Sequence, residues 1–200
     1  GFAALVALVE KQGALTSRGR TVPQLKGKGL LILTPTVGAD GKDLEKIIAS
    51  RRRIGPTMLI LPKWGAFEAK MFGAQTKEGW VKLYGVQSPS WPADMGADAF
   101  STDVAGQDRG RKPGWSGLGM TGAMPDAHVQ FGKENTYAPL ITDDAGHMLV
   151  GFRDDEGRYP DLADAAGIVP LDEDTANTAL YPLIVVFDPD LLNNWGMGDR

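Results

Sequence analysis

A continuous apolar run near the C-terminus constrains the fold of this chain more than any other stretch. Residues 183–187 read LIVVF, and the acidic turn Asp188-Pro189-Asp190 follows directly. An unbroken run of this length between turn residues is typical of a β-strand that is buried on both faces, as in a parallel sheet. Leu191 then begins what reads as a helix start. Ligands in open α/β sheets bind outside the carboxyl ends of the strands, so this turn is the first candidate site.

Two similar runs lie in the first third of the chain. Residues 29–34 (GLLILT) and 57–61 (TMLIL) are bounded by glycine and proline, and Asp40 is placed to cap a helix that runs to about Arg52 between them. This order predicts a βαβ unit. We therefore expect these two strands and strand 183–187 to form the centre of a mainly parallel sheet.

The remaining periodic segments are shorter. A hairpin over 137–153 should extend one edge of the sheet in antiparallel orientation, because its two alternating strands flank a turn-forming segment. The other predicted elements are a helix over 2–12, an edge strand over 14–20, a half-exposed strand over 80–86 and a short helical turn over 159–166.

The middle of the chain has a different composition. Glycine, proline, aspartate and serine dominate residues 88–135, and the apolar periodicity is lost. This composition predicts a long loop insertion with little regular structure, covering one end of the sheet. A chain of 200 residues then suits one domain, residues 1–200, that carries this insertion.

The amino-acid composition excludes several kinds of functional site. The chain has no cysteine, which excludes disulfides, cysteine-ligated zinc and a thiol nucleophile. A net charge of −4 gives no general attraction to nucleic acid. The one basic run, residues 51–53, is expected to be a solvated face that complements the dipole at the end of its helix.

Two motif-like stretches lack the context that their chemistry needs. Residues 117–122 match GxGxxG, but no buried strand precedes them and Pro125 stands where the helix should run, so we expect a flexible loop. The sequence around Ser116 lacks the second glycine of a nucleophile elbow. The two histidines, His128 and His147, carry no further sign of a Ser-His-Asp triad.

The acidic turn has a structural and a chemical interpretation. The structural one is that Asp190 caps the next helix while Asp188 holds the turn through backbone N–H groups. The chemical one is a metal-assisted hydrolase, in which both carboxylates bind Mg²⁺ or Ca²⁺ with Asp40 as a possible third. We expect the structural role, with no metal and no cofactor.

The tryptophans suggest another alternative. Trp64, Trp91 and Trp115 lie in or beside predicted loops, where an aromatic side chain is not needed for a strand. Such side chains can stack on sugars, which would make the chain a carbohydrate-binding module, or they can pin the insertion onto the sheet.

Two blocks of sequence resemble a known family. Residues 2–65, with GLLILTP and TMLILPKWG, and residues 185–199, VVFDPDLLNNWGMGD with its Asn194-Trp195-Gly196 stretch, are similar to a bacterial family of unknown function. Its members are membrane-anchored and carry a domain like class I glutamine amidotransferases. The resemblance implies an α/β fold, a flavodoxin-like three-layer sandwich. Amidotransferases use a Cys-His-Glu triad, which a chain without cysteine lacks.

The resemblance also implies a location, while the missing cysteine nucleophile, the two histidines and the loop insertion favour a non-catalytic function. We expect a non-catalytic binding or scaffold domain of a membrane-anchored envelope protein, with the soluble domain in the periplasm. Its partners would be other membrane or envelope proteins, not nucleic acid, and a small-molecule ligand is not identifiable. The candidate ligand-binding residues are Asp188, Asp190, Asn194, Asp40, Trp64 and Trp115.

Overall fold

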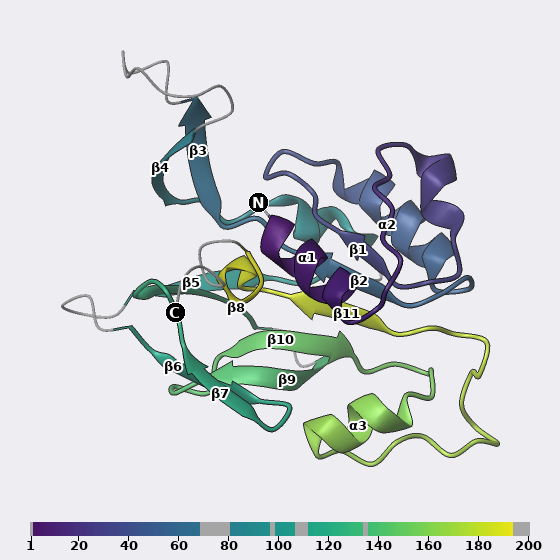
Figure 1. Ribbon diagram of the computed structural model, residues 1–200. Coiled ribbons are helices and arrows are strands. Elements are labelled where there is room, and N and C mark those ends of the chain that lie inside the picture. The colour runs from purple at the N-terminus through teal and green to yellow at the C-terminus, as the bar shows by residue number, and fades with distance from the viewer. Residues whose placement is uncertain (1, 69–80, 97–98, 107–111, 134–135, 194–200) are drawn as a thin grey trace.

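The computed structural model describes residues 2–68, 81–96, 99–106, 112–133 and 136–193 (Figure 1). Its helices are α1 (Ala3–Lys11), α2 (Gly41–Arg51) and α3 (Pro160–Ala166), with 3-10 turns η1 (Val22–Lys26), η3 (Trp91–Asp94) and η6 (Pro189–Leu191). Its strands are β1 (Leu31–Leu33), β2 (Thr57–Ile60), β3 (Trp64–Glu68), β4 (Val81–Val86), β5 (Thr102–Gly106), β6 (Gly114–Gly117), β7 (Met120–Ala123), β8 (His128–Gly132), β9 (Tyr137–Asp143), β10 (Met148–Arg153) and β11 (Leu183–Val186).

Nine strands form one mixed sheet, in the order β1-β2-β11-β10-β9-β6-β7, with β8 beside the start of β10 and β5 beside β8. Only β1, β2 and β11 run parallel; β11 meets β10 antiparallel, as do the other neighbours in this sheet. The strands β3 and β4 form a separate antiparallel ribbon. The expected flavodoxin-like sandwich with a mainly parallel sheet is therefore wrong.

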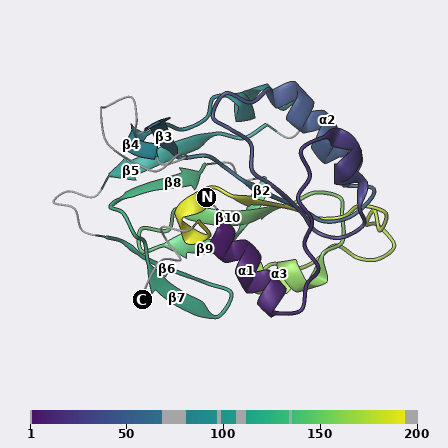
Figure 2. The same cartoon turned by 45° about the horizontal axis from the view of Figure 1, so that its top comes forward.

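The parallel part of the sheet is covered on both faces. Leu183 and Val185 point to a core that also contains residues of α2 and η3, whereas Ile184 and Val186 point to a second core with residues of α1 and α3. Figures 1 and 2 show α1 and α2 on opposite sides of these strands. This two-sided burial explains why the run is apolar at every position, and it confirms that strand 183–187 lies inside the sheet.

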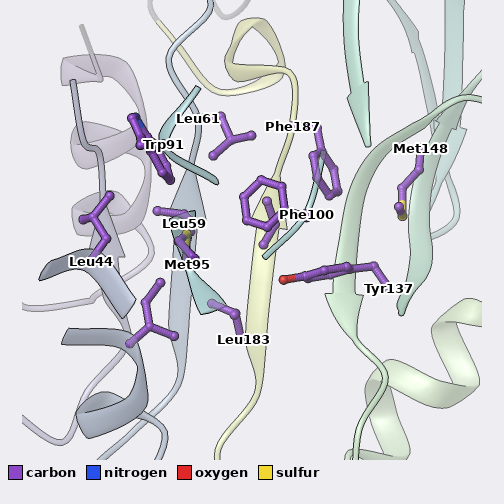
Figure 3. Close-up of a cluster of buried hydrophobic side chains, with 12 residues drawn as sticks. Leu44, Leu59, Leu61, Trp91, Met95, Phe100, Tyr137, Met148, Leu183 and Phe187 are labelled. Atoms are coloured by element: carbon purple, nitrogen blue, oxygen red, sulfur yellow. The ribbon is translucent and has the colours of Figure 1, made fainter. Parts of the chain in front are cut away.

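The first core is centred on aromatic side chains that meet edge to face (Figure 3). The ring of Phe187, directly after β11, lies 5.6 Å from that of Phe100 and 5.9 Å from that of Tyr137 between centroids. Trp91 of η3 is buried in the same core and donates from Nε1 to the carbonyl oxygen of Thr36 at 3.0 Å. Trp91 therefore pins its segment to the sheet and does not face a ligand.

The predicted insertion is the main correction at the level of elements. Residues 88–135 contain η3 and the strands β5 to β8, which join the main sheet instead of covering it as a loop. The reason is that these short, glycine-rich strands gain order through pairing with distant strands, as in the register of Trp115 with Asp143. The GxGxxG stretch contains the last residue of β6, the tight turn at Leu118 and Gly119, which both have positive φ, and the first three residues of β7, so the expected flexible loop is wrong.

Other predictions were correct locally and wrong in placement. The hairpin 137–153 is present as β9 and β10, but it lies inside the sheet because β10 pairs with β11 and β9 with β6. Strand 29–34 shortens to β1 at the edge of the sheet, and residues 14–20 form no strand. The helices near 2–12 and 159–166 and the strand near 80–86 are confirmed.

The capped helix is confirmed, but the solvated basic face at its end is confirmed only for Arg53 and is wrong for Arg51 and Arg52. The Asp40 carboxylate accepts from the backbone N of Asp43 at 3.1 Å, at the start of α2. At the other end Arg51 is only 2% exposed, and its guanidinium donates to the carbonyl oxygens of residues 25, 27, 29 and 56. Arg52 is buried as well. Arg51 and Arg52 thus bind the neighbouring loops together, whereas Arg53 is exposed.

Candidate functional site

Charged side chains meet where the two central parallel strands end. Because β2 and β11 are parallel neighbours, the residues that follow them lie at the same edge of the sheet. These residues are Lys63 after β2 and Asp188 after β11, and Asp190 comes two positions later. Lys63 is 1% exposed and both aspartates are 0% exposed. We call these three residues the buried ion cluster.

The ammonium group of Lys63 is fully engaged. Its Nζ lies 2.8 Å from Oδ2 of Asp188 and 2.7 Å from Oδ2 of Asp190, and it donates to the carbonyl oxygen of His128 at 2.7 Å. An ammonium carries three N–H donors, and each has an acceptor here. A buried lysine retains its charge only with such compensation, since an unpaired charge is very costly to bury.

Asp188 connects the cluster to the backbone. Its Oδ1 accepts from the backbone N of Asp190 at 2.9 Å, and its Oδ2 accepts from the backbone N of Gln130 at 2.9 Å. Asp188 is thus the N-cap of η6. The sequence assigned the cap to Asp190, which is wrong, whereas the backbone-holding role of Asp188 is confirmed.

Asp190 binds side chains instead. Its Oδ1 accepts from Nε1 of Trp64 at 2.8 Å and from Nδ2 of Asn193 at 2.6 Å. The Lys63 Nζ also lies 5.1 Å from the centroid of the Trp64 ring, close enough for a cation–π contact. The cluster therefore holds the first residue of β3.

Gln130 completes the network at an irregular point of the sheet. The neighbour of β10 changes along its length: residues 150–152 pair with β11, whereas Met148 pairs with Gly132 of β8. The Gln130 amide donates from Nε2 to the carbonyl oxygens of Pro62 at 3.1 Å and Phe187 at 2.7 Å, while Oε1 accepts from Ser88 at 2.9 Å. These bonds satisfy backbone groups that the broken ladder leaves without a strand partner.

Burial raises the pKa of the Asp188 carboxyl to about 6, because desolvation and the charge of Asp190 outweigh Lys63 and the backbone N–H group. A carboxyl with a raised folded-state pKa binds its proton more tightly in the native state. Its contribution to stability is complete below the unfolded value near 4 and is lost as the pH rises through about 6.

We therefore expect the stability advantage of the native chain over Asp188→Asn to shrink between pH 4 and pH 7, by up to about 3 kcal/mol. The amide does not titrate, so the difference between the two proteins isolates residue 188 from the other carboxyl groups. Urea denaturation of both proteins across this range measures it. A difference that stays constant or grows toward pH 7 would contradict the raised pKa.

The structure brings together only part of the candidate set. Asp188, Asp190 and Trp64 are in contact, while Asp40 is exposed at the start of α2 and has its own capping bond. Trp115 is half-buried on β6 and packs against the small core around Met124. Asn194 lies outside the described residues.

Sequence reasoning missed Lys63 and Gln130. Lys63 carried a usable signal, since it follows the apolar run 57–61 by two residues, and a lysine that is buried there needs a nearby anion. Gln130 carried none, because its role depends on the point where β11 ends. Within the residues that the structure describes, no group of three or more His, Asp or Glu side chains is placed to hold a metal ion. The carboxylate oxygens of the acidic turn are instead bonded to lysine, tryptophan, asparagine and backbone donors.

No helix among the described residues has both the length and the apolar character to cross a membrane. Comparison with protein-family models, curated proteins and solved structures gives no match for this chain.

Proposed function

We propose that this chain is a non-catalytic binding or scaffold domain of a membrane-anchored bacterial envelope protein, and that it contacts another envelope protein through the ribbon of β3 and β4. The observation that carries the proposal is the ribbon itself. It extends away from the body of the domain in Figure 1, and in the described part of the chain its strands pair only with each other.

The ribbon has the chemistry of a binding element. Leu83 is 42% exposed and Tyr84 is 53% exposed. A two-stranded ribbon alone is marginally stable in water, and strand edges can accept a further strand from another protein. A Cβ added at Gly65 would lie 2.2 Å from the Tyr84 ring, so the ring packs directly over the Gly65 backbone of β3, and its hydroxyl donates to Oε1 of Gln87 at 2.6 Å. A fixed, exposed aromatic ring is a typical anchor in protein interfaces.

The buried ion cluster holds the base of this ribbon. Trp64 bonds to Asp190, and the backbone N of Gln87, just after β4, donates to the carbonyl oxygen of Lys63 at 2.6 Å. The strand ends, where an α/β enzyme would bind its ligand, are thus occupied by side chains that bond to each other. This favours a binding role for the domain over metal-assisted hydrolysis at Asp188 and Asp190.

Membrane anchoring and the periplasmic location are part of the proposal. Their support is the resemblance of residues 2–65 and 185–199 to a membrane-anchored bacterial family. An envelope location would place the ribbon among other membrane and envelope proteins, which are the partners we propose.

Site-specific photo-cross-linking in cells of the source organism tests this function. Benzoylphenylalanine at position 84 is expected to give a discrete adduct with an envelope protein, and Leu83→Asp in the same chain should abolish it. Position 181 is the matched control, because Tyr181 is 43% exposed on the body of the domain. No adduct from position 84, or an equal adduct from position 181, would refute the proposal.

A further inference from the structure

A second feature of the surface is a hollow of about 420 Å³ between the end of α2 and the end of β10. Its wall carries the guanidinium groups of Arg52, Arg53 and Arg153 and the carboxylates of Asp155 and Glu156. Three positive and two negative groups leave a local charge of +1, in a chain whose net charge is −4. Arg53 and Leu180 of the hollow precede β2 and β11, whereas the buried ion cluster follows the ends of these two strands, and the two sites share no residue.

The deepest of these arginines is held in place. Arg52 donates to the carboxylate of Asp155, to the hydroxyl of Tyr159 and, from Nε, to the carbonyl oxygen of Tyr181 at 3.1 Å. Its side chain is 9% exposed and that of Asp155 is 15% exposed. A guanidinium that is already fixed loses little conformational entropy when it contacts a ligand.

The negative charge of Asp155 is neutralised by the neighbouring arginines. Burial alone would raise its pKa, but Arg52, the backbone N–H of Gly157 and Tyr159 hold the pKa below its usual range, so the carboxylate stays ionised. Arg153 also approaches it, with Nε 3.5 Å from Oδ2. The negative charge of Asp155 is thus shared by two arginines, while Arg53 and Glu156 are exposed at the rim.

We propose that this hollow binds the phosphate group of a small molecule or of a lipid headgroup. Guanidinium groups present planar pairs of N–H donors that match phosphate oxygens, and here they come from two different elements around one space. The volume lies within the range of small-molecule sites, about 300–1,000 Å³. Leu180 in the same wall offers an apolar contact for the uncharged part of the ligand.

Titration calorimetry of the whole chain with glycerol 3-phosphate tests the proposal at low salt. We expect saturable binding that Arg53→Glu weakens by at least about ten-fold, because the change reverses a charge at the rim. Arg18→Glu is the matched control, since Arg18 is an exposed arginine in residues 14–20, and it should leave the affinity unchanged. Arg153→Gln is the second variant and should also weaken binding.

Removing the carboxylate of Glu156 should change the ligand affinity in the opposite direction. Glu156→Gln removes a repelling charge, so it should tighten binding by roughly three- to five-fold. Glu173→Gln changes an exposed acid in a loop outside the hollow and should have no effect. A purely structural role for these side chains would not produce tighter binding in any variant.

Vesicles separate the two possible sources of phosphate. Phosphatidylcholine vesicles with and without phosphatidic acid are sedimented with the native chain and with Arg53→Glu. Binding that requires phosphatidic acid and Arg53 assigns a headgroup, whereas binding of glycerol 3-phosphate alone assigns a soluble ligand, and either result supports the site. Failure of both probes to bind at millimolar concentration, or equal weakening by Arg18→Glu, would overturn it.

Discussion

Replacing Lys63 by methionine is expected to lower the free energy of unfolding by about 3–5 kcal/mol at neutral pH. Methionine keeps most of the length of the side chain but removes the charge that Asp188 and Asp190 share. Both carboxylates are fully buried, so water does not replace the lost ammonium group. Equilibrium denaturation in urea, with the native chain measured in parallel, gives the difference.

The exposed ion pair between Lys133 and Asp103 provides the matched control. Its Nζ–Oδ2 distance is 3.2 Å, and the two side chains are more than half exposed. Lys133→Met should therefore cost less than about 1 kcal/mol, the usual range for surface pairs. A similar small loss for Lys63→Met would contradict the buried role of the cluster.

A second substitution tests whether the loss comes from unpaired charge. Asp190→Asn alone breaks a bond to Lys63, but in the Lys63→Met background it removes a carboxylate that has lost its cation. We expect it to destabilise the native chain and to restore stability to the Lys63→Met variant. Simple addition of the two single effects would show that the pair does not interact.

The cluster also shows where prediction from the sequence ends. The run at 183–187 identified an interior strand, because five successive apolar residues need burial on both faces, and Asp40 identified a helix start through local bonding. The pairing of Lys63 with Asp188 joins residues 125 positions apart. It depends on β2 and β11 being neighbours, which no local pattern records.

The fold class was wrong for a related reason. The parallel unit from β1 to β2 was predictable from two apolar runs and a capped helix. The antiparallel majority comes partly from β6 and β7, whose residues 114–117 and 120–123 are rich in glycine and only partly buried. Such strands have no clear alternation, and they are ordered by their registers with each other and with β9. Composition therefore indicated a loop where tertiary pairing forms a sheet.

The second large effect is expected from Phe187→Ala, which should destabilise the chain by about 3–5 kcal/mol. Phe187 is 0% exposed and packs edge to face against the rings of Phe100 and Tyr137, which also contact each other, so its removal leaves a cavity beside two aromatic groups (Figure 3). Phe131→Ala is the control, because Phe131 is only half-buried and stacks on His147 at the surface, and its loss should be clearly smaller.

A substitution at Gly132, which contacts the Phe187 ring, tests whether the cavity left by Phe187→Ala can be refilled. A Cβ at position 132 would meet the Phe187 ring at 2.5 Å, so Gly132→Ala should cost about 1–3 kcal/mol in the native chain through overpacking. In the Phe187→Ala background the added methyl group fills part of the cavity, and the same substitution should be neutral or stabilising. Urea denaturation of the native chain, both single variants and the double variant measures this coupling. Additive losses would mean that the ring and Gly132 are not in contact, and that the absence of a side chain at Gly132 has another cause.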